Sequence, residues 1–168
     1  MKILGLALVS LTPVIIGLYY AGRGRCRLAD LRQLKKALEV LQGEISFAFT
    51  ALPEAAEHVA SRVEEPVSGL FASFAAALSG GGGSAAEAWG QALGRTRLFL
   101  EEEDAECLRA FGKTLGYLDR DLQIGAIRTV LGQLADRENF LAEKQRKDGK
   151  LYRNLGILGG LLVAVLLW

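Results

Sequence analysis

The sequence of 168 residues contains only one histidine, His58, and two cysteines, Cys26 and Cys107. Protein zinc sites use three or four Cys, His or carboxylate ligands that converge on the ion, and neither cysteine here belongs to a CxxC pair. No serine lies in a GxSxG frame, so His58 is the one candidate catalytic base that the sequence offers. We therefore expect no metal, no cofactor and no catalytic residue, and we interpret the chain as a protein that is not an enzyme.

The sequence also lacks a large net charge. Its 20 Lys and Arg residues nearly balance its 19 Asp and Glu residues, and the formal net charge at pH 7 is +1. So small a charge does not create the field that holds a nucleic acid or gathers a charged substrate. We therefore expect neither a nucleic acid nor a small-molecule substrate as a partner. The length supports one domain, which excludes a second, catalytic domain.

One rival interpretation is an enzyme. Glu54 and His58 stand about one helical turn apart, and such a pair would suit the acid–base chemistry of a small membrane-bound hydrolase. A histidine on an exposed helix surface is the more common explanation of this spacing. Replacement of His58 by alanine separates the two interpretations, because only an enzyme would lose its function.

Charged residues are absent, or nearly so, from two runs at the ends of the sequence. Residues 3–21 form an uncharged run of 19 residues, which as a helix rises about 28 Å and matches a hydrocarbon core of roughly 30 Å. Residues 151–168 are uncharged apart from Arg153, whose side chain can reach toward headgroups, and this run rises about 27 Å. We predict transmembrane helices at 3–21 and 151–168, on either side of a domain at 22–150. A cleaved signal peptide and a buried C-terminal helix are the alternatives.

Basic residues gather beside both runs. Residues 23–36 carry six cations against one anion, and residues 144–153 carry five against one. Because segments rich in Lys and Arg stay on the cytoplasmic side, this pattern predicts a multi-pass protein of the cell membrane, with a cytoplasmic domain and the lipid bilayer as a partner. The basic residues predicted to flank the membrane are Arg23, Arg25, Arg27, Lys147, Lys150 and Arg153. Small residues four apart are predicted to let the two spanning helices pack closely, namely Gly17, Ala21, Gly156 and Gly160.

The residues between the two runs have helical spacing and no strand pattern. Six apolar residues recur at intervals of three or four, as on one face of a helix that continues from the first run, namely Leu28, Leu31, Leu34, Leu38, Leu41 and Ile45. Similar stripes follow along the chain, and no proline occurs after position 119. The fold class is therefore all-α, a helical bundle of about six helices flanked by N- and C-terminal transmembrane helices. We expect the first and last helices of the domain to be antiparallel neighbours.

Short sequence signals mark the ends of some helices. Thr50 is the predicted N-cap of one helix, with Pro53 in its first turn. The four glycines Gly80–Gly83 predict a flexible linker and lack the Lys and Ser/Thr pair of a phosphate-binding loop. Ser84 and Glu87 then form a predicted capping box that opens the next helix.

Acidic residues supply the candidate partner interface. The run at 101–104 favours the positive end of a helix dipole, and its carboxylates are also suited to bind a basic partner. We hypothesise that exposed charged residues in this run and before the last helix contact a partner protein, namely Glu101, Glu102, Glu103, Asp119, Arg120 and Asp121. Reversal of these charges tests the hypothesis, because it should abolish partner binding.

A set of short segments, in a particular order and spacing, covers nearly the whole chain. The segments are Leu31–Leu34 with Ala37–Leu38 and Leu41, Glu44–Ile45, Pro66–Val67 with Leu70–Phe71 and Phe74, Ala88–Trp89 with Ala92–Leu93, Phe111–Gly112 with Leu115–Gly116, Asp119–Arg120 with Gln123, and Leu151–Gly156 with Gly159–Leu162. Together they resemble the stage III sporulation protein AB family of endospore-forming bacteria. The chain departs from that family at Thr50–Pro53, because it reads Thr-Ala-Leu-Pro where the family usually has Thr-Pro-Leu.

This resemblance implies a part in the channel complex that joins mother cell and forespore during engulfment. It also implies a likeness to the helical cytoplasmic domains of F-type platform proteins of type II secretion and type IV pilus systems, which bind an assembly ATPase without doing chemistry. The implied partners are other stage III sporulation proteins, in particular an assembly ATPase, and the implied location is the mother-cell side of the outer forespore membrane. A platform subunit of another secretion or pilus system is the alternative.

Overall fold

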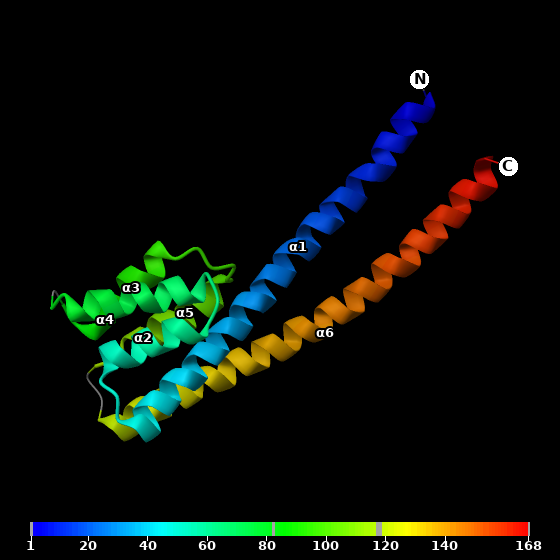
Figure 1. The fold of residues 1–168 in the computed structure, drawn as a ribbon. Helices are drawn as coiled ribbons and strands as arrows, with labels where there is room; N and C mark the ends of the chain where they lie inside the picture. The colour runs from blue at the N-terminus through cyan, green and yellow to red at the C-terminus, as the bar shows by residue number, and fades with distance from the viewer. Residues whose placement is uncertain (1, 82, 117–118, 168) are drawn as a thin grey trace. The chain divides into compact units, whose positions relative to one another are not determined.

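The computed structural model of the chain describes residues 2–81, 83–116 and 119–167, with side chains described from residue 22 to residue 147 within these ranges. All regular structure in these ranges is helical, as Figure 1 shows. The elements are α1 (Lys2–Gly43), the π-helix η1 (Glu44–Ala48), α2 (Leu52–Arg62), α3 (Val67–Ser79), α4 (Ala85–Arg95), α5 (Glu102–Gly112) and α6 (Arg120–Leu167). The predicted all-α class, with about six helices, is confirmed.

The predicted multi-pass location in the cell membrane is contradicted. Among the residues that the structure describes, no helix combines the length and the apolar character that crossing a bilayer requires. We therefore withdraw the membrane location, its cytoplasmic and outer-forespore assignments, and the lipid bilayer as a partner. The backbone at 3–21 and 151–167 is helical. The predicted spans at 3–21 and 151–168 nevertheless lie outside the residues whose side chains are described, together with Gly17, Ala21, Lys150, Arg153, Gly156 and Gly160.

The chain divides into two compact units. Residues 26–138 form one unit, called here the bundle unit, and residues 1–25 with 139–168 form the other. In the second unit, Lys147 Nζ lies 2.7 Å from Glu143 Oε1 one turn earlier on α6, a spacing that supports an exposed helix. The candidate partner-binding sites lie within the bundle unit.

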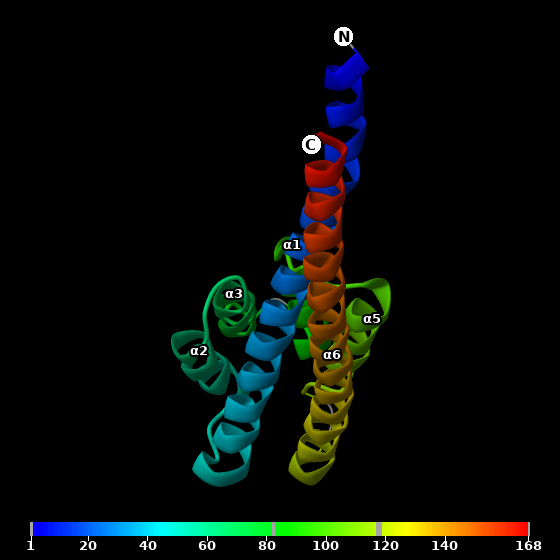
Figure 2. The same cartoon turned by 90° about the vertical axis from the view of Figure 1, so that its right-hand side faces the viewer.

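Within the bundle unit, the later part of α1 and the first part of α6 lie side by side and antiparallel (Figures 1 and 2). At one end of this pair, Glu138 accepts hydrogen bonds from Arg32 Nε at 2.9 Å and from Lys35 Nζ at 3.1 Å. At the other end, Arg120 Nε donates to the carbonyl oxygen of Ile45 at 2.9 Å. These contacts confirm the expected antiparallel pairing of the first and last helices. The leucine stripe of α1 is buried, as its spacing predicts.

The helices α3 to α5 share an aromatic core centred on Trp89. The rings of Phe71, Phe74 and Phe111 meet the Trp89 ring edge-on, with centroids 5.2 to 5.5 Å away, a favourable arrangement for aromatic pairs. The indole Nε1 donates to the carbonyl oxygen of Leu108 at 2.8 Å, so its polar group is satisfied although the side chain is buried. Gly112 lies so close to this ring that a Cβ atom there would clash with the indole.

The ends of two helices show which capping predictions hold. The capping box before α4 is confirmed, because Glu87 N donates to Ser84 Oγ at 3.3 Å and Ser84 N donates to Glu87 Oε2 at 3.1 Å. The predicted Thr50 cap is wrong. The N-cap of α2 is Ala51, and the Thr50 hydroxyl donates instead to the Glu44 carboxylate at 3.0 Å.

Candidate partner-binding sites

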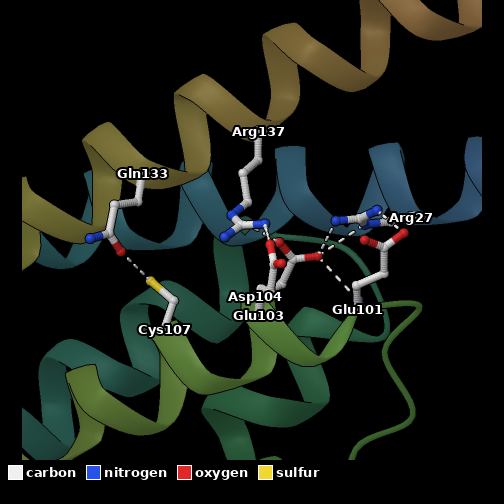
Figure 3. Close-up of polar contacts among 7 residues, drawn as sticks. All are labelled: Arg27, Glu101, Glu103, Asp104, Cys107, Gln133 and Arg137. Carbon is white, nitrogen blue, oxygen red and sulfur yellow. Dashed lines mark hydrogen bonds and ion pairs between the residues drawn. The ribbon is translucent and has the colours of Figure 1, made fainter.

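A buried carboxylate joins α5 to both α1 and α6. Asp104 is 0% exposed, and its Oδ2 accepts hydrogen bonds from Arg27 Nε at 2.9 Å and Arg27 Nη2 at 2.6 Å (Figure 3). Its Oδ1 lies 3.3 Å from Arg137 Nε, an ion-pair distance without hydrogen-bond geometry. Asp104 Oδ2 also accepts the backbone N–H of Glu101 at 3.1 Å and so caps α5. Two cations and one amide compensate the cost of burying this charge.

The three acidic residues predicted as a partner interface surround this buried group. Each pairs with an arginine of the same chain, Glu101 with Arg27, Glu102 with Arg109 and Glu103 with Arg137. The hydrogen bond from Arg137 holds the pKa of Glu103 below its usual value. All three side chains are nevertheless at least 67% exposed, where such pairs contribute little to stability and a partner's arginine can replace the internal one.

A second polar centre, Glu44, is the first residue of η1, directly after the end of α1. Its carboxylate accepts the Thr50 hydroxyl at 3.0 Å, lies 3.0 Å from His58 Nδ1, and lies 3.3 Å from Arg62 Nη1. Its carbonyl oxygen accepts the backbone N–H groups of both Phe49 and Thr50. The hydrogen bond with His58 is the main reason why the pKa of Glu44 lies below its usual value. Glu44 thus fixes the turn that connects η1 to α2.

This turn presents two aromatic rings to solvent. Phe47 is 86% exposed and Phe49 is 73% exposed. Phe49 has a φ of 56°, a left-handed conformation that non-glycine residues seldom adopt. The guanidinium of Arg120 stacks over the Phe49 ring, 3.9 Å from its centroid, and donates to the carbonyl oxygens of Ile45 and Ser46. We call the group formed by Phe47, Phe49 and Arg120 the aromatic tip.

The structure does not bring the two halves of the predicted interface together. Asp119 and Asp121 flank Arg120 at the aromatic tip, whereas Glu101 to Glu103 surround Arg27 at the other end of the bundle unit. Arg27 and Ile45, which mark the two ends, stand 18 residues apart on one helical segment. At 1.5 Å per residue this separation is about 27 Å. A single small contact therefore does not cover both acidic sets.

The proposed hydrolase pair is not a pair in the structure. The ring of His58 contacts Glu44, on the element before α2, and no hydrogen bond or ion pair joins His58 to Glu54 among the described residues. Within those same residues, no group of three or more His, Cys, Asp or Glu side chains is arranged to hold a metal ion. The contact between Glu54 and His58 on which the hydrolase interpretation depended is therefore not made among these residues.

The four described residues among those predicted to flank a membrane have different environments. Arg23 and Arg25 are exposed, and Lys147 pairs with Glu143. The Arg27 side chain is only 12% exposed, because it turns toward Asp104 and Glu101.

Sequence reasoning missed the aromatic tip and the role of Glu44. The signal was present as Phe47 and Phe49, two aromatic residues that continue the chain after the last apolar residue of the α1 stripe, Ile45. Residues two apart do not share a face of an α-helix, so this pair was unexplained by helical spacing. The contacts of Arg27 with Asp104 were also missed, because the two residues lie 77 positions apart in the chain.

Comparisons with known proteins place these features in a family. The family described as "Stage III sporulation protein AB" matches residues 2–168. A similar protein, stage III sporulation protein AB of Bacillus subtilis (strain 168), is 35% identical over 169 residues and covers 99% of each chain. A solved structure of stage III sporulation protein AB is 36% identical, with a TM-score of 0.67, and the match covers 73% of this chain and 98% of that one. The chain therefore belongs to the stage III sporulation protein AB family.

Proposed function

We propose that the chain is a docking subunit of the channel complex between mother cell and forespore, and that it binds an assembly ATPase and other stage III sporulation proteins without doing chemistry. The family assignment supports a role in sporulation. It also favours the sporulation setting over the alternative of another secretion or pilus system. The docking role and the ATPase partner are our proposal.

The observation that carries the proposal is the aromatic tip. Most large apolar side chains of the bundle unit are buried, yet Phe47 and Phe49, two residues apart at the end of η1, are exposed to solvent. Burial of one phenylalanine side chain contributes about 1.5 to 3 kcal/mol, so covering both rings would supply about 3 to 6 kcal/mol of binding free energy. A contact of this size suits one component of a larger assembly, in which several surfaces act together.

Docking requires a surface that keeps its shape without the partner. Arg120 holds the Phe49 ring from one side, and Glu44 holds the backbone of the same turn through two N–H groups. A side chain that is already ordered loses less entropy on binding, which favours association.

The test uses the full chain in spore-forming cells. We expect Phe47→Ser to reduce both co-purification of the assembly ATPase and the number of heat-resistant spores at least tenfold, because it removes an exposed apolar contact of about 2 kcal/mol. Leu122→Ser is the matched control, since Leu122 is also large, apolar and 60% exposed. Normal ATPase co-purification and normal spore counts with Phe47→Ser, at the same protein level as the control, would refute the proposal.

A further inference from the structure

The described side chains around the aromatic tip leave a surplus of negative charge. Asp119 and Asp121, which flank Arg120, are exposed and form no ion pair with any residue whose side chain is described. The only cation in the tip itself is Arg120, and its guanidinium is held by two carbonyl oxygens and by the Phe49 ring. The surface that a partner meets is therefore apolar in the middle and acidic at its edge.

Aromatic faces add a second preference for positive charge. The Phe49 ring already accepts the Arg120 guanidinium on one face, which shows that the tip can hold a cation in this way. Phe47 is 86% exposed, so its ring remains open to a cation from outside. A Lys or Arg placed over such a ring gains about 0.5 to 1 kcal/mol at an exposed site. An acidic partner would gain nothing from these rings and would be repelled by the carboxylates of Asp119 and Asp121.

The architecture limits how a partner backbone can take part. Among the described residues there is no β-strand, so a partner segment has no sheet edge to join. The contact then depends on side chains, and an amphipathic helix places apolar residues at i, i+3 and i+4 on one face. Two apolar rings with acidic residues at the edge match a helix whose apolar stripe is bordered by Lys and Arg.

We propose that the aromatic tip binds a basic amphipathic helix of a partner protein, with Phe47 and Phe49 contacting its apolar stripe and Asp119 and Asp121 contacting its cations. This inference rests on the proposed docking function and adds the chemistry of the partner segment. It also separates the predicted interface into two parts, because Asp119 and Asp121 meet the partner while Glu101 to Glu103 retain their internal arginines.

The position of Leu122 provides a control inside the same helix. Leu122 is two residues after Arg120, so the two side chains point about 200° apart around α6. Leu122 is 60% exposed but lies on a different face from the residue that stacks on Phe49. A partner that covers the aromatic tip should therefore be insensitive to Leu122→Ser.

The experiment uses two labelled helical peptides of 18 residues. Both carry the same leucine stripe, and their polar positions are all Lys in one and all Glu in the other. Fluorescence anisotropy with the full chain measures the two affinities. We expect the Leu/Lys peptide to bind at least tenfold more tightly than the Leu/Glu peptide. We expect Phe47→Ser to weaken binding of the Leu/Lys peptide at least fivefold, and Leu122→Ser to change this affinity less than twofold. The double variant Asp119→Asn with Asp121→Asn should lower the ratio of the Leu/Lys affinity to the Leu/Glu affinity at least fivefold.

Several outcomes would overturn the inference. Equal affinity for the two peptides refutes the basic chemistry of the partner. Equal losses of Leu/Lys peptide binding with Phe47→Ser and with Leu122→Ser refute the placement of the binding site at the aromatic tip. Circular dichroism spectra of each variant must match the parent, and Phe47→Leu, which keeps an apolar side chain at the same position, should retain most of the binding. If only the Ser variant fails to fold, loss of binding by Phe47→Leu with a normal spectrum refutes the proposed apolar contact.

The two proposals fail in different ways. If Phe47→Ser abolishes ATPase co-purification while the peptides show no preference, the docking function stands and the partner chemistry is wrong. If the Leu/Lys preference holds while ATPase co-purification and spore formation survive Phe47→Ser, the tip binds basic helices and the proposed docking function is wrong.

Discussion

The buried ion pair between Arg27 and Asp104 gives the sharpest test of how the bundle unit is held together. In the variant Arg27→Ala, Asp104 would remain fully buried and would keep only the Glu101 amide at 3.1 Å and Arg137 Nε at 3.3 Å. It would lose two hydrogen bonds, at 2.9 and 2.6 Å, from a guanidinium whose side chain is only 12% exposed. Removal of one partner of a buried pair costs about 3 to 5 kcal/mol.

Two features of the site place the expected cost at the lower end of that range. Asp104 still faces a second cation, Arg137, and the Arg137 side chain is one-third exposed, so it can move toward the carboxylate. We therefore expect Arg27→Ala to lower the free energy of unfolding by about 3 kcal/mol. Urea denaturation of the full chain, followed by circular dichroism at 222 nm, measures this loss as a shift of the midpoint at constant slope.

Matched variants separate the buried pair from its exposed surroundings. Glu101→Ala removes the exposed half of the same cluster and should cost less than about 1 kcal/mol, because Glu101 is 67% exposed. The double variant Arg27→Ala with Asp104→Ala removes both charges, and we expect a coupling free energy of at least about 1.5 kcal/mol between the two sites. A loss below about 1 kcal/mol for Arg27→Ala, or a loss equal to that of Glu101→Ala, would refute this account.

Three further predictions concern other parts of the bundle unit. Gly112→Ala should lower the free energy of unfolding, measured by urea denaturation, by more than about 2 kcal/mol, because the added methyl group meets Trp89. Gly90→Ala is the control and should cost less than about 1 kcal/mol, because the space at its Cβ is open. Equal effects of the two substitutions would contradict close packing of Gly112 on Trp89. The pKa of Glu44 is lowered mainly by the hydrogen bond with His58, and the pKa of Glu138 mainly by the hydrogen bond from Arg32. Both carboxylates therefore stabilise the fold fully above the pKa of an unfolded glutamate, about 4.3. This stabilisation is lost as the pH falls through their lower pKa values in the folded protein. A pH series of unfolding midpoints checks this, and Glu44→Gln should flatten it; an unchanged series would contradict the role of Glu44. His58→Ala should leave heat-resistant spore counts within about fivefold of the parent, since the docking role needs no base; a loss on the order of a thousandfold at normal protein level would support an enzyme instead.

The parts of the fold that sequence reasoning predicted are those fixed by local periodicity. The apolar stripe from Leu28 to Ile45 follows helical spacing, and all six of its residues are buried. The capping box joins Ser84 to Glu87, three positions later, and forms as expected. Both signals depend on neighbours within one or two turns, which a single sequence displays directly.

The parts that were not predicted depend on contacts distant in sequence. Nothing near Asp104 in the chain indicates that Arg27 will neutralise it, because the pairing appears only when α5 packs against α1. The aromatic tip depends on a π-helix and on a left-handed Phe49, and neither has a periodic signature. The predicted Thr50 cap failed for a related reason, since the Glu44 carboxylate competes for the same hydroxyl.

Because the backbone of Phe49 is left-handed, the residue that would give the most stable protein at this position differs from the residue that would bind a partner best. A glycine adopts φ of 56° without the crowding that a Cβ atom causes, so Phe49→Gly should relieve strain in the isolated chain. The same change removes one of the two rings that the proposed helix would contact. A library of variants sorted for thermostability alone would therefore enrich glycine at residue 49 and discard the recognition surface, so engineering of this protein should select for binding and stability together.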